Sequence, residues 1–309
     1  MQHNTSWFLI LNLMMLFACG CIEVRDKKGA EETPLVPAMV EVQKFDELIV
    51  SEDLYIYEGK LLTKTQLEYE KFRLKEELSR AVRDYEFSFE HIEFKEGVTL
   101  YTLGNRVRLH TKTLSATKAR VTSFPQNQKA PPGVPGRSGG HILFEIGVAE
   151  GNLLFEMRGE NGGDGLAGKA PDDSLKGASG KEGMPANCNS LLIPKSFNGG
   201  PGEPGKKGFP GENGERGGDA GTLEILVHES GAFMPEIKKI PGQGGHGGAG
   251  GAGGAGGDGG KAGRRFPLCP EAKAGSPGPQ GASGDPGMRG EDGVANTACI
   301  NKDTRTFCY

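Results

Sequence analysis

The sequence predicts a mostly β protein whose second half is a bundle of polyproline-II helices, with one amphipathic α-helix near residues 65–85. The first observation is glycine at every third position, in runs at 199–217, 242–263 and 275–293. Period three belongs to the polyproline-II helix, which has three residues per turn and no internal hydrogen bonds. The second observation is the alternation of apolar and polar side chains, which is typical of strands. The third is a stretch in which apolar side chains recur with the period of an α-helix. Glycine at every third position leaves one edge of such a helix without side chains, which allows the backbones of neighbouring segments to come into contact.

Composition divides the chain into two regions. Of its 309 residues, 51 are glycine and 19 are proline, yet residues 40–125 are poor in glycine and rich in apolar side chains. We therefore expect a β-rich domain with one helix at 38–125, a linker at 126–140 and a glycine repeat region with interspersed strands at 141–298. The net charge is −4, with cations and acids interleaved. A surface that binds the phosphate backbone of a nucleic acid needs a continuous stripe of positive charge, so no nucleic-acid partner is expected.

The N-terminus is typical of an exported protein. Residues 1–18 include an apolar stretch that is shorter than the roughly 20 residues of a membrane span, which favours a signal peptide. Leu16-Phe17-Ala18-Cys19 resembles the lipobox of bacterial lipoproteins. The resemblance implies a lipid on Cys19, with Cys21 as the alternative frame. The polar, proline-containing residues up to position 37 are expected to form a lipidated tether at 19–37.

Strand and helix periods follow one another in the β-rich domain. Residues 45–62 alternate apolar and polar side chains, whereas residues 65–85 place their apolar side chains on one helical face. Short alternating stretches return at 92–124, separated by turns such as Gly104-Asn105. A β-solenoid is favoured over a β-sandwich because strands continue into the glycine-rich half. The clearest of these later strands are predicted at His141–Ile146, Leu153–Met157 and Thr222–Val227.

The run at 244–260 has two glycines in every triplet, so two of the three edges of a polyproline-II helix carry no side chain. We expect this run inside a bundle and the runs with one glycine per triplet, such as 275–293, at its surface. Backbone N–H and C=O groups would pair between neighbouring segments. The repeat glycines expected to make these contacts are Gly202, Gly205, Gly208, Gly211, Gly214, Gly248, Gly251, Gly254, Gly278, Gly281, Gly284 and Gly287.

Cysteine usage fits an oxidising compartment. Beyond the N-terminus, the disulfide candidates are Cys188, Cys269, Cys299 and Cys308, and four cysteines allow three pairings. Pairing Cys299 with Cys308 would close a C-terminal loop at 299–309, and pairing Cys188 with Cys269 would join two glycine-rich runs. Since no Cys/His spacing typical of zinc is present, no metal and no cofactor is expected.

No motif indicates a catalytic residue. Residues 163–169 match the G-x-x-x-x-G-K pattern of a phosphate-binding loop, but Ala170 stands where serine or threonine is needed. The histidines are scattered singly. We therefore expect no enzyme. The alternative is a carbohydrate-active β-solenoid enzyme that holds its acids at 86–96 and carries the glycine-rich part as an accessory region.

Two stretches support a family resemblance. Gly202 to Gly217 and Gly275 to Gln280 resemble the bacterial collagen-like proteins, and the run at 244–260 is similar to the polyglycine-II bundles of phage adhesins and some antifreeze proteins. The resemblance implies a non-enzymatic structural or adhesive protein at the cell surface or outside the cell. A trimeric collagen-like stalk is the other assembly, but it is not favoured because strands interrupt the short glycine blocks.

The same resemblances bear on location and partners. Gly20 follows Cys19 in place of the aspartate that retains lipoproteins at the inner membrane, which implies the outer membrane. The expected partners are that membrane, through the N-terminal lipid, and a surface protein or glycan as the ligand.

Overall fold

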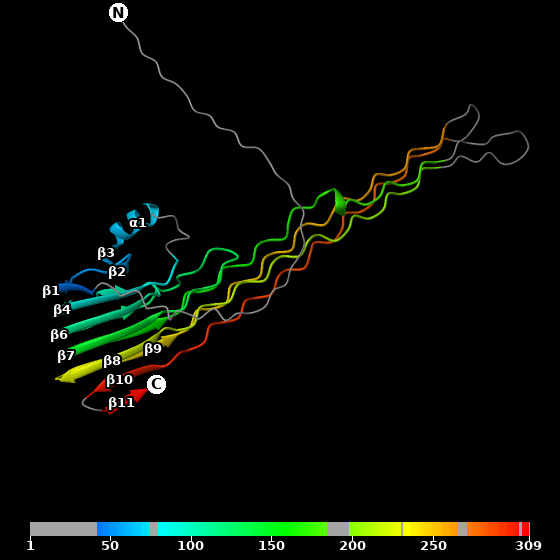
Figure 1. Ribbon diagram of the computed structural model, residues 1–309. Helices are drawn as coiled ribbons and strands as arrows, with labels where there is room; N and C mark the ends of the chain where they lie inside the picture. The colour runs from blue at the N-terminus through cyan, green and yellow to red at the C-terminus, as the bar shows by residue number, and fades with distance from the viewer. Residues whose placement is uncertain are drawn as a thin grey trace, which may run out of the picture. The chain divides into compact units, whose positions relative to one another are not determined.

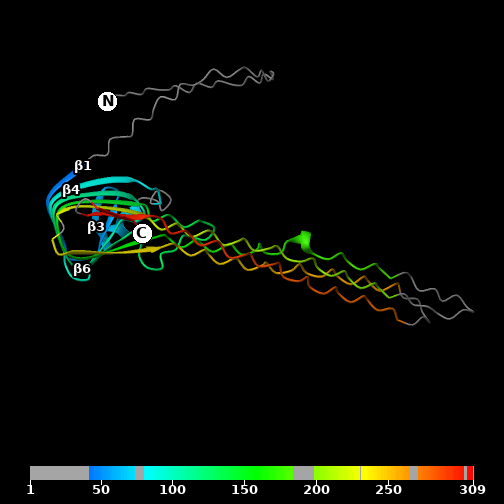
Figure 2. The same ribbon diagram turned by 90° about the horizontal axis from the view of Figure 1, so that it is seen from below.

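The computed structural model describes six stretches of the chain. These are residues 42–73, 80–183, 198–229, 231–264, 271–302 and 305–308. The chain divides into two units, Met1–Met39 and Val40–Tyr309, and all described residues belong to the second unit (Figures 1 and 2). The predicted signal peptide, the tether and both candidate lipidation sites, Cys19 and Cys21, lie outside the described residues.

β-Strands dominate the described residues, which confirms the predicted mostly β class. One mixed sheet of eleven strands is present in this part of the chain, with the helices α1 (Lys64–Arg73) and η1 (Asp173–Leu175), the latter a turn of 3-10 helix. The strands are β1 (Val42–Val50), β2 (Leu54–Tyr57), β3 (Lys60–Thr63), β4 (Asp84–Phe94), β5 (Thr99–Tyr101), β6 (Arg106–Thr122), β7 (His141–Arg158), β8 (Thr222–Glu229), β9 (Phe233–Ile240), β10 (Ala298–Lys302) and β11 (Arg305–Cys308).

Most of these strands stack in parallel, in two series. β1, β4, β6, β7, β8 and β10 form the first series through the N-terminal parts of β6 and β7. β2, β5 and β9 join the C-terminal parts of the same two strands to form the second. β6 and β7 belong to both series because they bend. β6 bends at a register shift between Ala116 and Ala119, and β7 bends beside Gly151, whose φ of +87° favours glycine.

The two series enclose the main hydrophobic core. Side chains alternate between buried and exposed along β6 and β7, as expected for strands with one face toward a core. Phe144 and Phe155 come from the two parts of β7, and their rings meet edge to face with centroids 6.2 Å apart. The bent strands therefore fold over onto a shared apolar interior, and burial of this interior is the main force that holds the sheet together.

The C-terminal edge of the sheet is an antiparallel hairpin. β10 continues the parallel series beside β8, and β11 turns back along β10. Cys299 and Cys308 face each other in this hairpin and form a disulfide. Of the predicted pairings, the one that closes the C-terminal loop is therefore present. Cys188 and Cys269 lie outside the described residues.

The predicted amphipathic helix is shorter than expected at its C-terminal end. α1 begins after Thr63, whose hydroxyl accepts a bond from the Gln66 N–H while the Gln66 side chain accepts from the Thr63 N–H. Residues 74–79 lie outside the described residues, residues 80–83 are not helical, and β4 begins at Asp84. The prediction of helix to residue 85 is wrong because Tyr85 joins the sheet beside Val107.

The long connections between strands carry the glycine repeats. β7 reaches β8 through residues 159–221, and β9 reaches β10 through residues 241–297. Residues 126–140, predicted as a linker between domains, connect β6 to β7, which pair along their length. This segment does not separate two sheets. It lies against the glycine repeats, since the Gly136 N–H donates to the carbonyl of Arg216 at 2.9 Å.

Candidate functional site

The glycine repeats form four segments in two out-and-back pairs. The first segment (159–183) follows β7 and the second (198–221) leads into β8, while the third (241–264) follows β9 and the fourth (271–297) leads into β10. Apart from η1, their described residues form neither helix nor strand. Figures 1 and 2 show the four segments side by side, leaving the sheet from the same end. We call the four segments together the glycine bundle.

Backbone hydrogen bonds join the segments at every third residue. Gly211 of the second segment donates to the carbonyl of Asp285 in the fourth at 2.9 Å. Gly251 of the third donates to Phe209 of the second, and Gly284 of the fourth donates to Gly251, both at 2.8 Å. Each of the twelve repeat glycines singled out from the sequence donates one bond of this kind. The amides of segments without internal hydrogen bonds are thus satisfied by their neighbours.

Glycine is needed in the bundle because of space. No described glycine of the four segments has a φ in the left-handed region, so conformational freedom is not the reason. A Cβ atom on Gly254 would overlap the carbonyl oxygen of Leu175 in the first segment. A Cβ atom on its neighbour Gly253 would overlap the carbonyl oxygen of Gly281 in the fourth. The third segment therefore needs two glycines per triplet because it has a neighbouring backbone on each of two edges.

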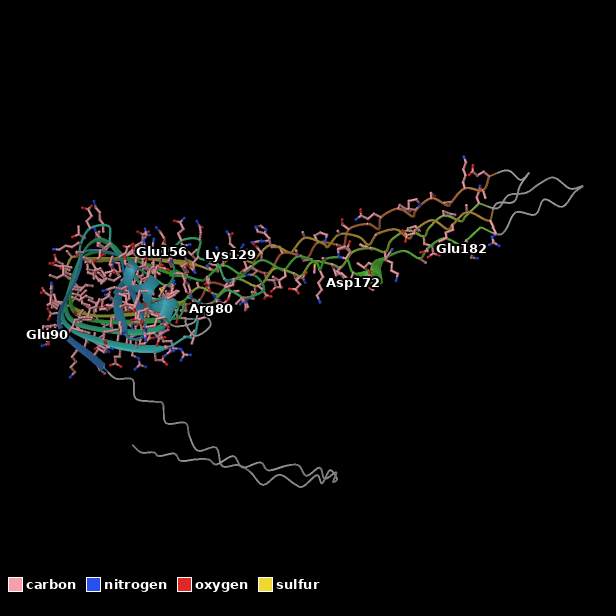
Figure 3. All side chains as sticks on the ribbon, turned by 90° about the horizontal axis from the view of Figure 1, so that it is seen from above. Arg80, Glu90, Lys129, Glu156, Asp172 and Glu182 are labelled. Atoms are coloured by element: carbon pink, nitrogen blue, oxygen red, sulfur yellow. A yellow bond between two sulfur atoms is a disulfide. The ribbon has the colours of Figure 1, made fainter. Side chains whose placement is uncertain are left out.

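The remaining edge of the third segment faces solvent. The seven side chains at this position are exposed along the length of the segment. They are Gln243, His246, Ala249, Ala252, Ala255, Asp258 and Lys261. Figure 3 shows side chains of the bundle pointing outward from its segments, whereas side chains of the sheet point both into its interior and outward. The bundle thus buries backbone and displays its side chains.

Asparagine and aspartate side chains complete the pairing between segments. The side-chain oxygens Oδ1 of Asn161 and Asp164 in the first segment accept from the backbone N–H groups of Gln243 and His246, each at 2.8 Å. Asn213 of the second segment accepts from Met288 N–H in the same way. These acceptors satisfy N–H groups that point away from the glycine contacts. The hydrogen bonds from the Lys129 side chain and His246 N–H lower the pKa of Asp164.

The first segment contains one bulge. Gly168 donates to Ala249 and Gly177 donates to Ala255, so nine residues of the first segment lie opposite six of the third. The three extra residues are accommodated in η1, where the Asp172 carboxylate accepts from Ser174 N–H at 2.9 Å. Leu175, the last residue of this turn, has a buried side chain. The bundle keeps its register on both sides of the bulge.

A buried carboxylate lies where the first glycine segment begins. Glu160 is 0% exposed and its Oε2 lies 2.9 Å from Arg80 Nη2 and 3.2 Å from Arg137 Nε. The backbone N–H of Arg137 donates to the same oxygen at 3.1 Å, and Gln128 lies 3.4 Å from Oε1. Burial alone would raise the pKa of Glu160, but the charge and hydrogen bonds of Arg137, together with the charge of Arg80, lower it below 4.5.

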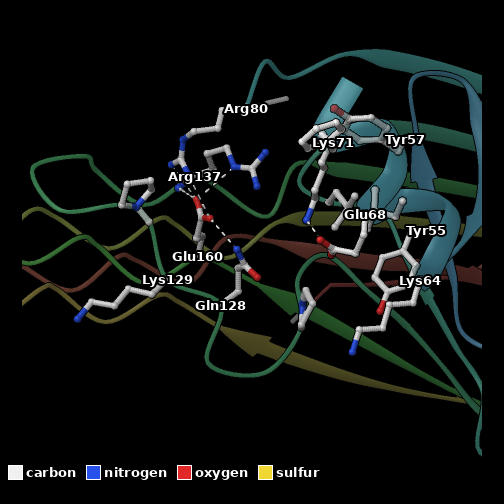
Figure 4. Close-up of a pocket in the computed structure, with 16 residues that line it drawn as sticks. Tyr55, Tyr57, Lys64, Glu68, Lys71, Arg80, Gln128, Lys129, Arg137 and Glu160 are labelled. Carbon is white, nitrogen blue, oxygen red and sulfur yellow. Dashed lines mark hydrogen bonds and ion pairs between the residues drawn. The ribbon is translucent and has the colours of Figure 1, made fainter. Parts of the chain in front are cut away.

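A cavity of about 770 Å³ lies between this carboxylate and α1 (Figure 4). One wall carries Arg80, Arg137 and Glu160, and the other comes from α1 and β2. Apolar groups of the lining are Tyr55, Tyr57, Leu67, Phe72, Leu103, Pro125, Ala130 and Pro131. The polar groups are Lys64, Glu68, Lys71, Arg80, Gln128, Lys129, Arg137 and Glu160. This cavity could not be predicted from the sequence, because its walls come from parts of the chain that meet only in the folded protein.

The acids at 86–96 lie on β4 and in the turn after it. Each has a cationic neighbour: Glu86 pairs with Arg108, Glu90 with Lys112, Glu93 with Lys95 and Glu96 with Lys118. No cluster of three or more metal-binding side chains occurs among the residues that the structure describes. Within the same residues, no helix has both the length and the apolar character to cross a bilayer.

Comparison with protein-family models, with curated proteins and with solved structures found no match to this chain.

Proposed function

We propose that this protein is a non-enzymatic structural or adhesive lipoprotein of the bacterial cell surface, anchored in the outer membrane through Cys19. In this proposal the four glycine segments are polyproline-II helices, with the third of the polyglycine-II type, and the two parallel series of strands are a β-solenoid. The supporting observation is the ladder of N–H to C=O bonds at every third residue, made by glycines whose Cβ atoms would collide with the next backbone.

This ladder supports an architectural role because backbone hydrogen bonds hold the segments together. In a bundle held together in this way most contacts between segments are made by backbone, so most side chains of the repeats are available at the surface, with Glu160, Leu175 and Ala220 as buried exceptions. Along the third segment the middle of the outward edge carries Ala249, Ala252 and Ala255, which have no acidic, basic or nucleophilic side chain, and polar residues stand only toward its ends. The second and fourth segments display mixed charged and polar residues such as Lys207 and Asp285, which pair across the surface. Such a surface is suited to recognition.

The same ladder favours a single-chain bundle over a trimeric stalk. In a collagen triple helix, the glycine of each triplet packs against two other chains. Here Gly278, Gly281 and Gly284 of the fourth segment donate to carbonyls of the third segment of the same chain. Partner chains are not needed to satisfy these amides. The strands between the glycine blocks serve to start and end each segment at the sheet.

Lipid labelling combined with cell attachment tests the proposal. In a bacterium that processes lipoproteins, we expect the wild-type protein to incorporate labelled palmitate, to sediment with outer membranes and to increase attachment of cells to glycan- or protein-coated surfaces. The Cys19→Ala variant should lose the label and the membrane fraction, because the lipidated thiol is gone. The Cys21→Ala variant is the matched control and should keep both. An unlabelled wild-type protein, or attachment that is unchanged when the protein is deleted, would contradict the proposal.

A further inference from the structure

The connection from β6 to β7 adds a short piece of chain to the glycine bundle. Residues 131–139 read Pro-Pro-Gly-Val-Pro-Gly-Arg-Ser-Gly, so glycine again stands at every third position. Figure 1 shows this connection beside the start of the bundle, and hydrogen bonds join residues 134–139 to the first and second segments. We call residues 134–139 the fifth segment.

The fifth segment donates hydrogen bonds to the second segment through its glycines. The N–H groups of Gly136 and Gly139 donate to the carbonyls of Arg216 and Asp219, each at 2.9 Å. A Cβ atom on Gly136 would overlap the carbonyl oxygen of Glu160 in the first segment. The fifth segment therefore fits against its neighbours only because it has glycine at these positions.

The fifth segment accepts hydrogen bonds from the first segment. The N–H groups of Gly163 and Glu160 donate to the carbonyls of Val134 and Arg137, each at 3.0 Å. Val134 and Arg137 each follow a glycine in the sequence. Each triplet of the fifth segment thus donates through its glycine N–H and accepts through the carbonyl of the next residue. All four bonds are made by backbone groups.

The donors of the first segment continue beyond the fifth segment, in the direction away from the sheet. Leu166 and Lys169 follow Glu160 and Gly163 at the same spacing of three residues. The backbone N–H groups of Leu166 and Lys169 make no hydrogen bond with any residue that the structure describes. The side chain of Leu166 is 49% exposed, so the bundle is open to solvent at this point.

The acceptors of the second segment continue in the same direction. Pro210 and Asn213 have the same spacing as the acceptors of the fifth segment, and their carbonyls accept no hydrogen bond from the described residues. The Oδ1 atom of Asn213 accepts from Met288 N–H at 2.8 Å, just as Oδ1 of Asp219 accepts from Val294 N–H at 2.9 Å. The backbone is thus held in the same way at Asn213 as at Asp219, whose carbonyl binds the fifth segment.

We propose that the groove formed by residues 166–169 and 210–213 binds a segment of another protein that is extended and has glycine at every third residue. Its glycine N–H groups donate to the second segment, and the carbonyls of the residues after glycine accept from the first segment, as in the fifth segment. The occupant comes from another protein because the glycine segments of a second copy are already hydrogen-bonded within its own bundle.

Backbone contact alone makes this groove selective. An extended segment of the polyproline-II type has no internal hydrogen bonds, so its N–H and C=O groups are available to both walls. A side chain in place of glycine would hold the occupant away from the groove, as the tight contact of Gly136 indicates. This inference names a partner class for the proposed adhesive function and rests on that function for its biological use.

Titration of the ¹⁵N-labelled mature protein with two peptides tests the inference. One peptide has three Gly-Pro-Pro triplets and the other has three Ala-Pro-Pro triplets, both with blocked ends. We expect the amide resonances of Leu166 and Lys169 to shift saturably with the glycine peptide. The alanine peptide should bind at least about tenfold more weakly, because its methyl groups overlap the neighbouring backbone. Unmoved resonances at millimolar glycine peptide, or equal affinity for the two peptides, would overturn the inference.

Proline variants locate the binding in the groove. Leu166→Pro removes one donor that makes no bond in the fold, and proline suits an extended segment. The affinity for the glycine peptide, followed at the Lys169 amide, should fall about threefold to tenfold while the melting temperature stays unchanged. Lys169→Pro, followed at the Leu166 amide, gives the same test if Leu166→Pro does not fold.

The matched control is Ala252→Pro, on the outward edge of the third segment, where the N–H group also lacks a partner among the described residues. This variant should keep the affinity of the wild type, and an equal loss in it would overturn the assignment to the groove. If the glycine peptide does not bind but lipid labelling and attachment persist, this inference fails and the proposed function stands. Peptide binding without labelling and attachment overturns the function and keeps the groove.

Discussion

Glu160 is the residue at which the sheet and the glycine bundle are joined electrostatically. It is fully buried, it follows the first repeat glycine, and it contacts side chains from two distant segments, Arg80 and Arg137. A buried ion pair contributes little net stability compared with apolar packing, because both charges lose their hydration. Removing one partner is costly, however, because it leaves the other charge buried and unpaired. The role of Glu160 is therefore to specify how these segments meet.

Replacement of Glu160 tests this role. Glu160→Gln should lower the free energy of unfolding by about 3–5 kcal/mol at neutral pH, since Arg80 and Arg137 lose their ion pairs with this carboxylate. The measurement is urea denaturation followed by circular dichroism. Glu90→Gln removes an exposed partner of Lys112 and, as the control, should change stability by less than about 1 kcal/mol. Equal effects of the two substitutions would contradict the role assigned to Glu160.

The pH dependence of the same two proteins gives a second check. The pKa of Glu160 is lower in the folded state than its ordinary value of 4.5. Its contribution to stability is therefore fully present above pH 4.5 and is lost as the pH falls through the folded pKa. Between neutral pH and this acid range, the wild type should lose more stability than Glu160→Gln. Parallel pH profiles would contradict the assignment.

For individual residues, the sequence predicts the contacts of the repeat glycines better than the contacts of polar side chains. The bare edges at Gly248 and Gly251 follow from period three alone, and both glycines donate between segments. Glu160 and the acceptor Asn213 could not be assigned in advance. Their roles depend on Arg80 and Met288, which lie 80 and 75 residues away along the chain. A repeat pattern indicates which edge is bare but not which neighbour it meets.

Among the elements, the third glycine segment has glycine on two edges and a neighbouring backbone against each of them. The N–H groups of residues such as Gly254 donate to carbonyls of the second segment, and the carbonyls of the same residues accept from N–H groups of the fourth. The carbonyls of the outward residues, such as Ala255, accept from N–H groups of the first segment. The two glycines per triplet of the third segment thus reflect neighbours on more than one side. The expectation that this run lies inside a bundle agrees with the burial of Gly254, whereas the exposure of Ala255 shows that the remaining edge lies at the surface.

A pair of adjacent substitutions tests the packing of this element. Gly254→Ala should destabilise the protein by about 1–3 kcal/mol or more, because the new methyl group overlaps the Leu175 carbonyl and the segments must separate. Ala255→Ser, one residue away on the exposed edge, is the matched control and should change stability by no more than about 0.5 kcal/mol. Thermal and urea denaturation provide the measurement. A neutral Gly254→Ala variant would show that the backbones do not approach as closely as described.

Other elements show where local patterns mislead. Residues 106–122 read as several short strands with turns between them, yet they form the single bent strand β6 because its register shift near Ala116 keeps both parts in the sheet. Tyr85 fits the helical pattern of the preceding residues, but pairing of β4 with β6 places it in a strand. In both cases long-range pairing decides between alternatives that the local pattern leaves nearly equal.

For the unit from Val40 to Tyr309, the connection order explains how one chain can contain both a sheet and a glycine bundle. Each pair of glycine segments is an excursion from one strand of the sheet to another, from β7 to its neighbour β8 and from β9, which pairs with β7, to β10, which pairs with β8. The sheet thus brings the ends of the segments together, and the glycine contacts extend that alignment along the bundle. The mostly β class and the presence of side-by-side glycine segments were predictable from the sequence. The order of pairing was not, because Gly165 and its partner His246 are 81 residues apart.

The central claim is that glycine amides of one chain bond to neighbouring segments at every third residue, and residue-resolved amide hydrogen exchange tests it most directly. The sample is the mature protein, shown to be monomeric by sedimentation. Amides of Gly245, Gly248, Gly251 and Gly254 should exchange at least about a hundredfold more slowly than those of Ala249, Ala252 and Ala255, since only the glycines donate between segments. Uniformly fast exchange along 242–263, or protection that appears only in a trimer, would contradict the account.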